Sequence, residues 1–222
     1  NEIFTVNRTK ETYKFLDLTD DEKNKIKLLA GHFPFGLHRK IKKNFSYVTF
    51  MRDPVERVVS AFYYNKEKET SDVYDIINDS TLTFMEYLKL NVEPWSMNAM
   101  TKHLAGCDAE GFKKVCTVEM FDMAMNNLKK YFICIGLTEH FDESLLILKE
   151  KLNWSIPSYK RQNVTKIKKE VKDIDNETIN YIKELNKFDI MIYDFGKQFF
   201  FADWNAIENK QRKLDEFRLK NS

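Results

Sequence analysis

The chain has few cysteines, glycines and prolines, the residues typical of disulfide frameworks and flexible linkers, and it lacks a long apolar run. It holds three cysteines, six glycines and four prolines among 222 residues. No apolar run approaches the roughly 18 residues that a membrane-spanning helix needs. An odd cysteine count without a C-x-x-C pair argues against a disulfide framework and against the usual ligand spacing of zinc. Without linkers, a single domain over residues 1–222 is expected, with a helical C-terminal part from about residue 166.

An excess of charge of either sign is lacking as well. Lys and Arg number 36 and Asp and Glu 34, so the formal net charge is +2. Proteins that bind a nucleic-acid duplex usually carry a stronger basic bias or a clustered basic face. The segment Lys166–Lys172 mixes lysine with glutamate, which is typical of a solvated face. Nucleic acid is therefore not an expected partner.

Hydrophobic residues, by contrast, are plentiful. They make up 43% of the chain and include 18 phenylalanines, which excludes general disorder. The chain also contains N-glycosylation sequons, which matter only in a secreted or luminal protein. A disulfide between Cys107 and Cys116 is an alternative if the protein occupies an oxidising compartment. The sequons begin at Asn7, Asn44, Asn78, Asn153, Asn163 and Asn176.

Strand-like and helix-like segments alternate along the chain, which predicts an α/β fold: a mostly parallel sheet flanked by helices. The β-branched and aromatic segment Tyr47–Met51 is predicted to be a central, buried strand. A second strand is expected at Tyr131–Ile135. Helices are predicted from Thr19, at Asp53–Tyr64, Thr83–Leu90, Trp95–Ala105, Met120–Lys129, Glu139 or Phe141 to Leu152, Asp175 or Asn176 to Leu185, and Asp203–Leu219.

The passage from the first strand into its helix has the features of an anion site. The strand delivers Arg52 to the carboxyl edge of the sheet, where α/β proteins bind ligands. Asp53 suits the N-cap, Pro54 the first helical position, and Glu56 the third position of a capping box. The helix start is expected to offer unpaired backbone N–H groups and the positive end of its dipole. Ser60 follows Asp53 by seven residues, about two turns, and therefore shares its face.

A guanidinium and a hydroxyl placed in this way suit a phosphate group. The alternative is that Arg52 pairs with Asp53 or Glu56 while Ser60 only packs. A candidate general base, His32, follows the apolar stretch Ile26–Ala30. Its ordinary pKa near 6.5 would let it accept a proton at neutral pH. A hydrogen-bonded structural histidine is the alternative there.

The segment Tyr47–Tyr64 closely resembles the 3′-phosphate-binding segment of sulfotransferases. The likeness is greatest to the branch of heparan and uronyl 2-O-sulfotransferases and bacterial sulfotransferase family 2 proteins. It implies a nucleotide-binding architecture of the P-loop type and a donor, 3′-phosphoadenosine-5′-phosphosulfate (PAPS), whose 3′-phosphate contacts Arg52 and Ser60. The segment Gly31–His38 looks like the family's Gly-His segment, which implies that His32 is the general base and that His38 contacts the substrate.

Further segments resemble the same family. Asn98–Gly106 is similar to an Asn-x-x-Thr-Arg-x-Leu-Ala-Gly run, which implies that Asn98 and Lys102 line the acceptor side. Gly136–Leu145 looks like a Gly-Leu-Thr-Glu scaffold segment. Tyr159–Thr165 resembles an Arg-x-Asn-Val segment, in which Arg161 would contact the donor.

One family element has no counterpart, namely the loop resembling Pro-Lys-x-x-Gly-Thr-Thr that holds the 5′-phosphosulfate. A strand, this loop and a helix are therefore expected upstream of Asn1. The resemblance implies sulfuryl transfer from PAPS to the hydroxyl of a carbohydrate or small molecule, without a metal. The alternative is a non-catalytic module that binds nucleotide or glycan. A bacterial cytoplasm is the expected compartment, with the Golgi lumen as the alternative, because the relatives divide between the two.

Overall fold

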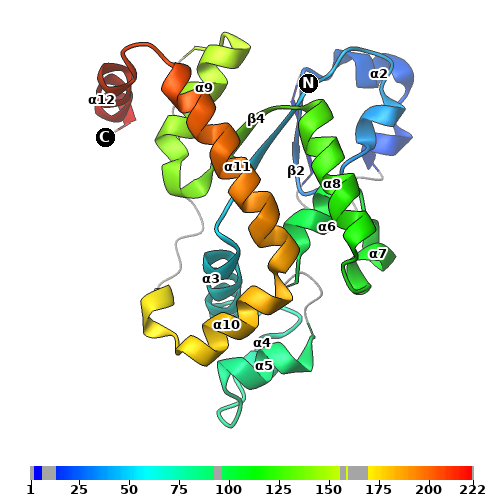
Figure 1. Ribbon diagram of the computed structural model, residues 1–222. Coiled ribbons are helices and arrows are strands. Elements are labelled where there is room, and N and C mark those ends of the chain that lie inside the picture. Colours follow the sequence, from blue (N-terminus) through cyan, green and yellow to red (C-terminus); the bar gives the residue numbers. More distant parts are fainter. Residues whose placement is uncertain (1–2, 7–13, 93–96, 156–158, 160–169, 222) are drawn as a thin grey trace. The chain divides into compact units, whose positions relative to one another are not determined.

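The computed structural model describes residues 3–6, 14–92, 97–155, 159 and 170–221 (Figure 1). Helices and short strands combine in the predicted α/β architecture. The chain divides into two compact units, one formed by Asn1–Tyr47 and Thr101–Tyr131, the other by Val48–Met100 and Phe132–Ser222. That residues 1–222 act as a single domain stays a prediction.

The first unit contains a parallel pair of strands. β1 (Ile3–Val6) pairs with β2 (Leu28–Gly31), with Ile3 opposite Leu28. Between them lies α2 (Asp20–Lys25), which begins at the predicted capping box of Thr19 and Glu22. After β2 come η1 (Leu37–Lys40), most of α6 (Ala99–Ala105), α7 (Ala109–Lys113) and α8 (Val118–Tyr131).

The second unit is built on the pair β3 (Tyr47–Met51) and β4 (Phe132–Leu137). Two helices pack against β4, α9 (Phe141–Leu152) and α11 (Lys187–Ala206), and Figure 1 shows α11 crossing this strand. The approach of α11 requires Gly196. A Cβ atom there would lie 2.6 Å from Met51 Sδ and 3.3 Å from Ile135 Cγ2.

A second apolar core of this unit surrounds α3 (Pro54–Glu67). The other helices of this core are α4 (Tyr74–Ile77), α5 (Phe84–Leu90) and α10 (Asn176–Leu185). Phe62 of α3 stacks on Phe84 with ring centroids 4.2 Å apart. The predicted capping box of Thr83 and Glu86 begins α5. The buried members of this core are Val55, Val58, Val59, Phe62, Tyr63, Val73, Ile77, Tyr87, Leu88 and Ile182.

The C-terminal part is helical among its described residues, but the predicted closing helix Asp203–Leu219 is wrong. The chain instead forms the long helix α11, breaks at Ile207, and continues as α12 (Lys210–Asn221). Asn209 at the break has a left-handed backbone, φ 52°, which a continuous helix cannot contain. Leu214 and Phe217 of α12 pack on Leu146 of α9.

Two further expectations are corrected. Among the described residues β3 pairs with β4 alone, so its predicted place in the middle of a sheet is not observed there. The helix after it runs to Glu67 rather than Tyr64. Cys107, Cys116 and Cys134 are free thiols, so no disulfide joins the first two.

Candidate functional site

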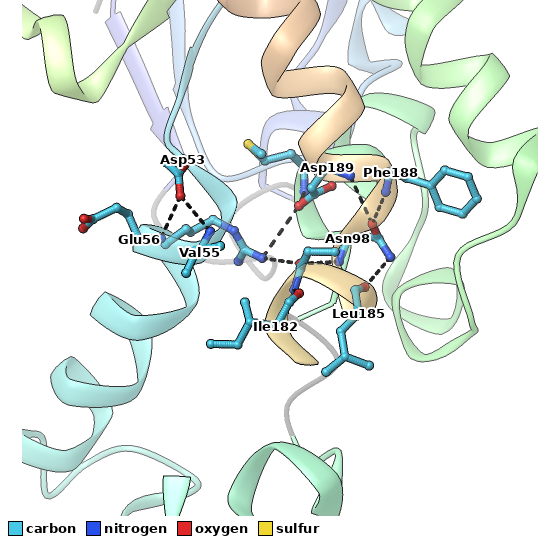
Figure 2. A network of polar contacts seen from close by, with 11 residues as sticks. Asp53, Val55, Glu56, Asn98, Ile182, Leu185, Phe188 and Asp189 are labelled. Atoms are coloured by element: carbon cyan, nitrogen blue, oxygen red, sulfur yellow. Dashed lines mark hydrogen bonds and ion pairs between the residues drawn. The ribbon is translucent and has the colours of Figure 1, made fainter. Parts of the chain in front are cut away.

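The passage from β3 into α3 has the predicted cap at its centre. Asp53 is the N-cap of α3, and its Oδ1 accepts hydrogen bonds from the N–H groups of Val55 at 2.9 Å and Glu56 at 3.0 Å (Figure 2). Pro54 occupies the first helical position and has no N–H to satisfy. Arg52 therefore lies between the last residue of β3, Met51, and the N-cap of α3.

The second half of the capping box is supplied from elsewhere in the chain. In a capping box the N-cap N–H donates to the side chain at the third helical position, here Glu56. The N–H of Asp53 instead donates to Glu139 Oε1 at 2.7 Å. Glu139 lies in η3 (Thr138–His140), directly after β4. It performs the role predicted for Glu56, whose carboxylate thereby stays beside Arg52.

These bonds overturn the expectation that the helix start offers unpaired N–H groups. The N–H of Arg57 donates to Asp53 O at 2.8 Å, and those of Val55 and Glu56 donate to the Asp53 side chain. The helix dipole still favours an anion near this end. Direct contacts to a phosphate must come from side chains, however, because the first amides of the helix already have acceptors.

Arg52 has a guanidinium that a ligand can reach. Its side chain is 36% exposed, and its Nη2 lies 3.5 Å from Glu56 Oε2. This pairing is one of the two alternatives left open by the sequence. An ion pair as exposed as this contributes about 0–1 kcal/mol, so an incoming phosphate can displace it at low cost.

Ser60 lies on α3 where the sequence predicts. It is partly exposed, and its hydroxyl makes no hydrogen bond with the described part of the chain. Asp53 and Ser60 are seven residues apart, so they differ by only about 20° around the helix axis. A hydroxyl in this position is available to a ligand that approaches the start of α3.

A buried tyrosine completes the surroundings of the helix start. Tyr193 of α11 is buried, and its pKa is raised by burial, by the carboxylates of Glu139 and Asp53, and by its contact with the Glu139 side chain. The phenol therefore stays protonated and able to donate a hydrogen bond. Sequence analysis missed Glu139 and Tyr193 as neighbours of Asp53. The Gly-Leu-Thr-Glu likeness was the one signal that marked Glu139.

The candidate base, His32, lies in the other unit. It follows β2 directly and is exposed. His32 therefore stands directly after a strand of the β1–β2 pair, whereas Arg52 follows a strand of the β3–β4 pair. Its role in proton transfer stays a prediction.

His38 belongs to an aromatic cluster of the first unit. Its ring stacks on Phe45 with centroids 4.5 Å apart, and Phe35 and Tyr131 lie at 5.1 Å and 5.0 Å. Its Nδ1 lies 2.9 Å from the hydroxyl oxygen of Tyr47. Burial, and secondarily the charge of Arg39, lowers the pKa of His38. The neutral ring is therefore favoured, and it is already engaged in packing.

Asn98, predicted to line the acceptor side, is buried. It is 7% exposed, and its Oδ1 accepts from the N–H groups of Phe188 at 3.0 Å and Asp189 at 3.1 Å (Figure 2). Its Nδ2 donates to Leu185 O. These bonds satisfy the first turn of α11, so the side chain has a structural role and the predicted substrate contact is not supported.

The same correction applies to Lys102. It is 2% exposed, and its Nζ donates to Phe112 O at 2.8 Å, within the first unit. The ammonium group caps a backbone carbonyl instead of facing an acceptor. Arg161, the third basic residue predicted for the site, lies outside the described residues.

The described residues offer neither a metal-binding cluster nor a membrane-spanning helix. They bring together no group of three or more His, Cys, Asp or Glu side chains able to hold a metal ion. None of their helices is both long enough and apolar enough to cross a bilayer.

With this geometry in place, comparison with known proteins identifies the family. The model of the sulfotransferase family matches residues 3–196. This chain belongs to the sulfotransferase family. A mouse (Mus musculus) relative, galactose-3-O-sulfotransferase 3, is 26% identical over 207 aligned residues, and the match covers 86% of this chain and 47% of that protein. The chain thus spans about half the length of the curated relative that it matches.

Proposed function

We propose that this sulfotransferase moves a sulfuryl group from PAPS to a hydroxyl of a carbohydrate acceptor. The observation that carries the proposal is the start of α3, where every first-turn amide has an acceptor while Arg52 and Ser60 stay accessible. A guanidinium just before the helix and a hydroxyl two turns along it suit a phosphate monoester such as the 3′-phosphate of PAPS. The name of the mouse relative makes galactosides the first acceptors to examine.

The residues of this chain have separate tasks in the proposed reaction. Arg52 and Ser60 hold the 3′-phosphate, and Arg161 is proposed as a further donor contact. The proton of the acceptor hydroxyl passes to His32 as the acceptor oxygen bonds to sulfur. The bond between sulfur and the phosphate oxygen breaks in the same step, and adenosine 3′,5′-bisphosphate leaves. Positioning and charge stabilisation supply the rate, as in phosphoryl transfer, and the step does not call on a metal.

His38 keeps a narrower role in the proposal. Its ring is packed among aromatic neighbours, so we propose that it shapes the acceptor side through this cluster and transfers no proton. Asn98 and Lys102 are left out of the acceptor site because both are buried. For the compartment we propose the Golgi lumen, the alternative expected from the sequence, because the matching relative comes from a mammal and not from a bacterium.

The test is transfer of ³⁵S from labelled PAPS to galactose-terminated oligosaccharides. It is run on this chain and on the chain extended by any residues encoded upstream of Asn1. Transfer that is lost in Ser60→Ala or Arg52→Ala is the expected result. Donor binding without transfer to any sugar in either form would favour the alternative, a binding module. No donor binding in either form would refute the proposal.

A further inference from the structure

Arg57 is the second arginine of the segment Tyr47–Tyr64, and neither the resemblance nor the site gives it a task. It lies on α3, four residues after Asp53 and three before Ser60. Residues three or four apart are neighbours on a helix surface. Two tasks are open to a guanidinium here: it can contact the phosphate itself, or it can hold the helix that presents Ser60.

Two contacts of the Arg57 guanidinium are with buried residues at the start of α11. Its Nη2 lies 3.3 Å from Asn186 Oδ1 and 3.7 Å from Asp189 Oδ2. The Asp189 side chain is 0% exposed and that of Arg57 is 21% exposed. A buried carboxylate needs a compensating charge and hydrogen bonds, because burial removes it from water. Met100 N donates one such bond to Asp189 Oδ2 at 3.1 Å.

The acceptors of Arg57 are themselves fixed at the start of α11. Asn186 is fully buried, and its Oδ1 accepts from both Arg57 and the N–H of Asn98, the latter at 2.9 Å. Asn98 in turn accepts from the first-turn N–H groups of α11, as Figure 2 shows for Phe188 and Asp189. Arg57 therefore ties α3 to a buried corner formed by Asn98, Asn186 and Asp189.

From this arrangement we propose that Arg57 is a positioning residue. Together with Asp189 it fixes the rotation of α3 about its axis, so that Ser60 faces the 3′-phosphate; this rests on the proposed function. Rotation matters because Arg57 and Ser60 differ by about 60° around the axis. A helix held through Arg57 cannot turn Ser60 away without separating the guanidinium from Asp189.

The two possible tasks of Arg57 predict opposite changes in the Kd for adenosine 3′,5′-bisphosphate when Asp189 is substituted. Asp189→Asn removes the charge that holds Arg57 but leaves the arginine in place. If Arg57 positions the helix, the Kd for adenosine 3′,5′-bisphosphate rises by about 2- to 30-fold, the range of coupling through neighbouring residues. The Kd for adenosine 5′-monophosphate, which lacks the 3′-phosphate, stays the same. If Arg57 is a phosphate ligand restrained by Asp189, the Kd for the bisphosphate falls.

Calorimetry with both nucleotides gives this comparison, and a thermal melt accompanies each variant. Lys213→Gln is the matched control, because Lys213 of α12 pairs at 3.0 Å with Glu150 in the last turn of α9, outside α3 and α11. It should leave the ratio of the two Kd values unchanged. A melting temperature that falls in Asp189→Asn while the ratio stays at the wild-type value would overturn the positioning role.

A second experiment tests the same proposal if the Asp189→Asn variant does not fold. Arg57→Lys keeps the charge but loses the planar fork, and it is measured alone and in the Ser60→Ala background. Positioning through Ser60 predicts that Arg57→Lys weakens 3′-phosphate binding alone and has little effect once Ser60 is gone. Equal effects in both backgrounds contradict it. A wild-type protein without preference for the bisphosphate would instead refute the proposed function itself.

Discussion

Arg52 is the residue on which the proposed donor site depends most directly, and Arg52→Ala tests it. Arg52 makes a 3.5 Å contact with Glu56, and both side chains are more than a third exposed. The variant should therefore unfold at nearly the wild-type temperature, because an exposed pair contributes about 0–1 kcal/mol at most. Binding should respond much more. A charge-assisted hydrogen bond contributes about 1.5–3 kcal/mol, which corresponds to a rise in Kd of about 12- to 150-fold.

The partner of Arg52 supplies a variant with the opposite expected effect. In the unliganded protein Glu56 competes with the phosphate for the guanidinium. Glu56→Gln should therefore lower the Kd for adenosine 3′,5′-bisphosphate, by up to about 5-fold if the pair contributes about 1 kcal/mol. Glu56→Gln should leave the Kd for adenosine 5′-monophosphate unchanged, provided that both titrations use the same salt concentration.

The assay is calorimetry of wild type, Arg52→Ala and Glu56→Gln with each nucleotide. The reasoning is refuted if wild type binds the two nucleotides equally well, or if Arg52→Ala leaves the ratio of their Kd values unchanged. A loss of affinity for both nucleotides together would show a distorted helix start instead of a lost phosphate contact. Circular dichroism of each variant separates that outcome from local loss.

Three further predictions concern catalysis, packing and thiol chemistry. His32→Ala should lower the single-turnover rate by roughly 10²–10⁴-fold with donor affinity retained, and a near-normal rate would remove His32 from catalysis. Gly196→Ala should destabilise the fold by about 1–3 kcal/mol in urea unfolding, because its Cβ would lie 2.6 Å from Met51 Sδ; an unchanged midpoint would contradict this packing. Burial raises the pKa of Cys134 to about 12, so iodoacetamide at pH 8 should label it only after unfolding. Peptide mapping that finds early labelling at Cys134 would show that β4 opens in the native state.

Features that depend on nearby residues were predictable from the sequence. The caps at Thr19, Asp53 and Thr83 each join groups two or three residues apart, so a short pattern contains both partners. The bounds of α10 and the end of α9 follow from the same kind of signal. The likeness of Tyr47–Tyr64 to the sulfotransferase motif also lies within one continuous segment.

The long helix α11 shows where periodicity fails. Its buried residues follow one stripe that includes Phe188, Ile192 and Phe200. The exposed side also carries apolar residues, Met191 at 51% and Phe201 at 41% exposed, so the sequence does not show a clear apolar stripe. Sequence analysis placed a helix only from Asp203 onward. The break at Ile207 was missed for a related reason, since Trp204, Leu214 and Phe217 fit one continuous stripe although they lie on two helices.

By itself the sequence determined that an arginine follows a strand, that a capped helix comes next, and that a serine stands two turns along it. It could not determine which groups complete the site. Glu139 reaches Asp53 across 86 residues, and Asn98 reaches Asp189 across 91. Only the tertiary structure decides such pairs, because an amide or carboxylate side chain bonds to whichever partner the packing of distant segments brings near it. For the same reason Asn98 and Lys102 became parts of the scaffold, while Arg52 stayed accessible to a ligand.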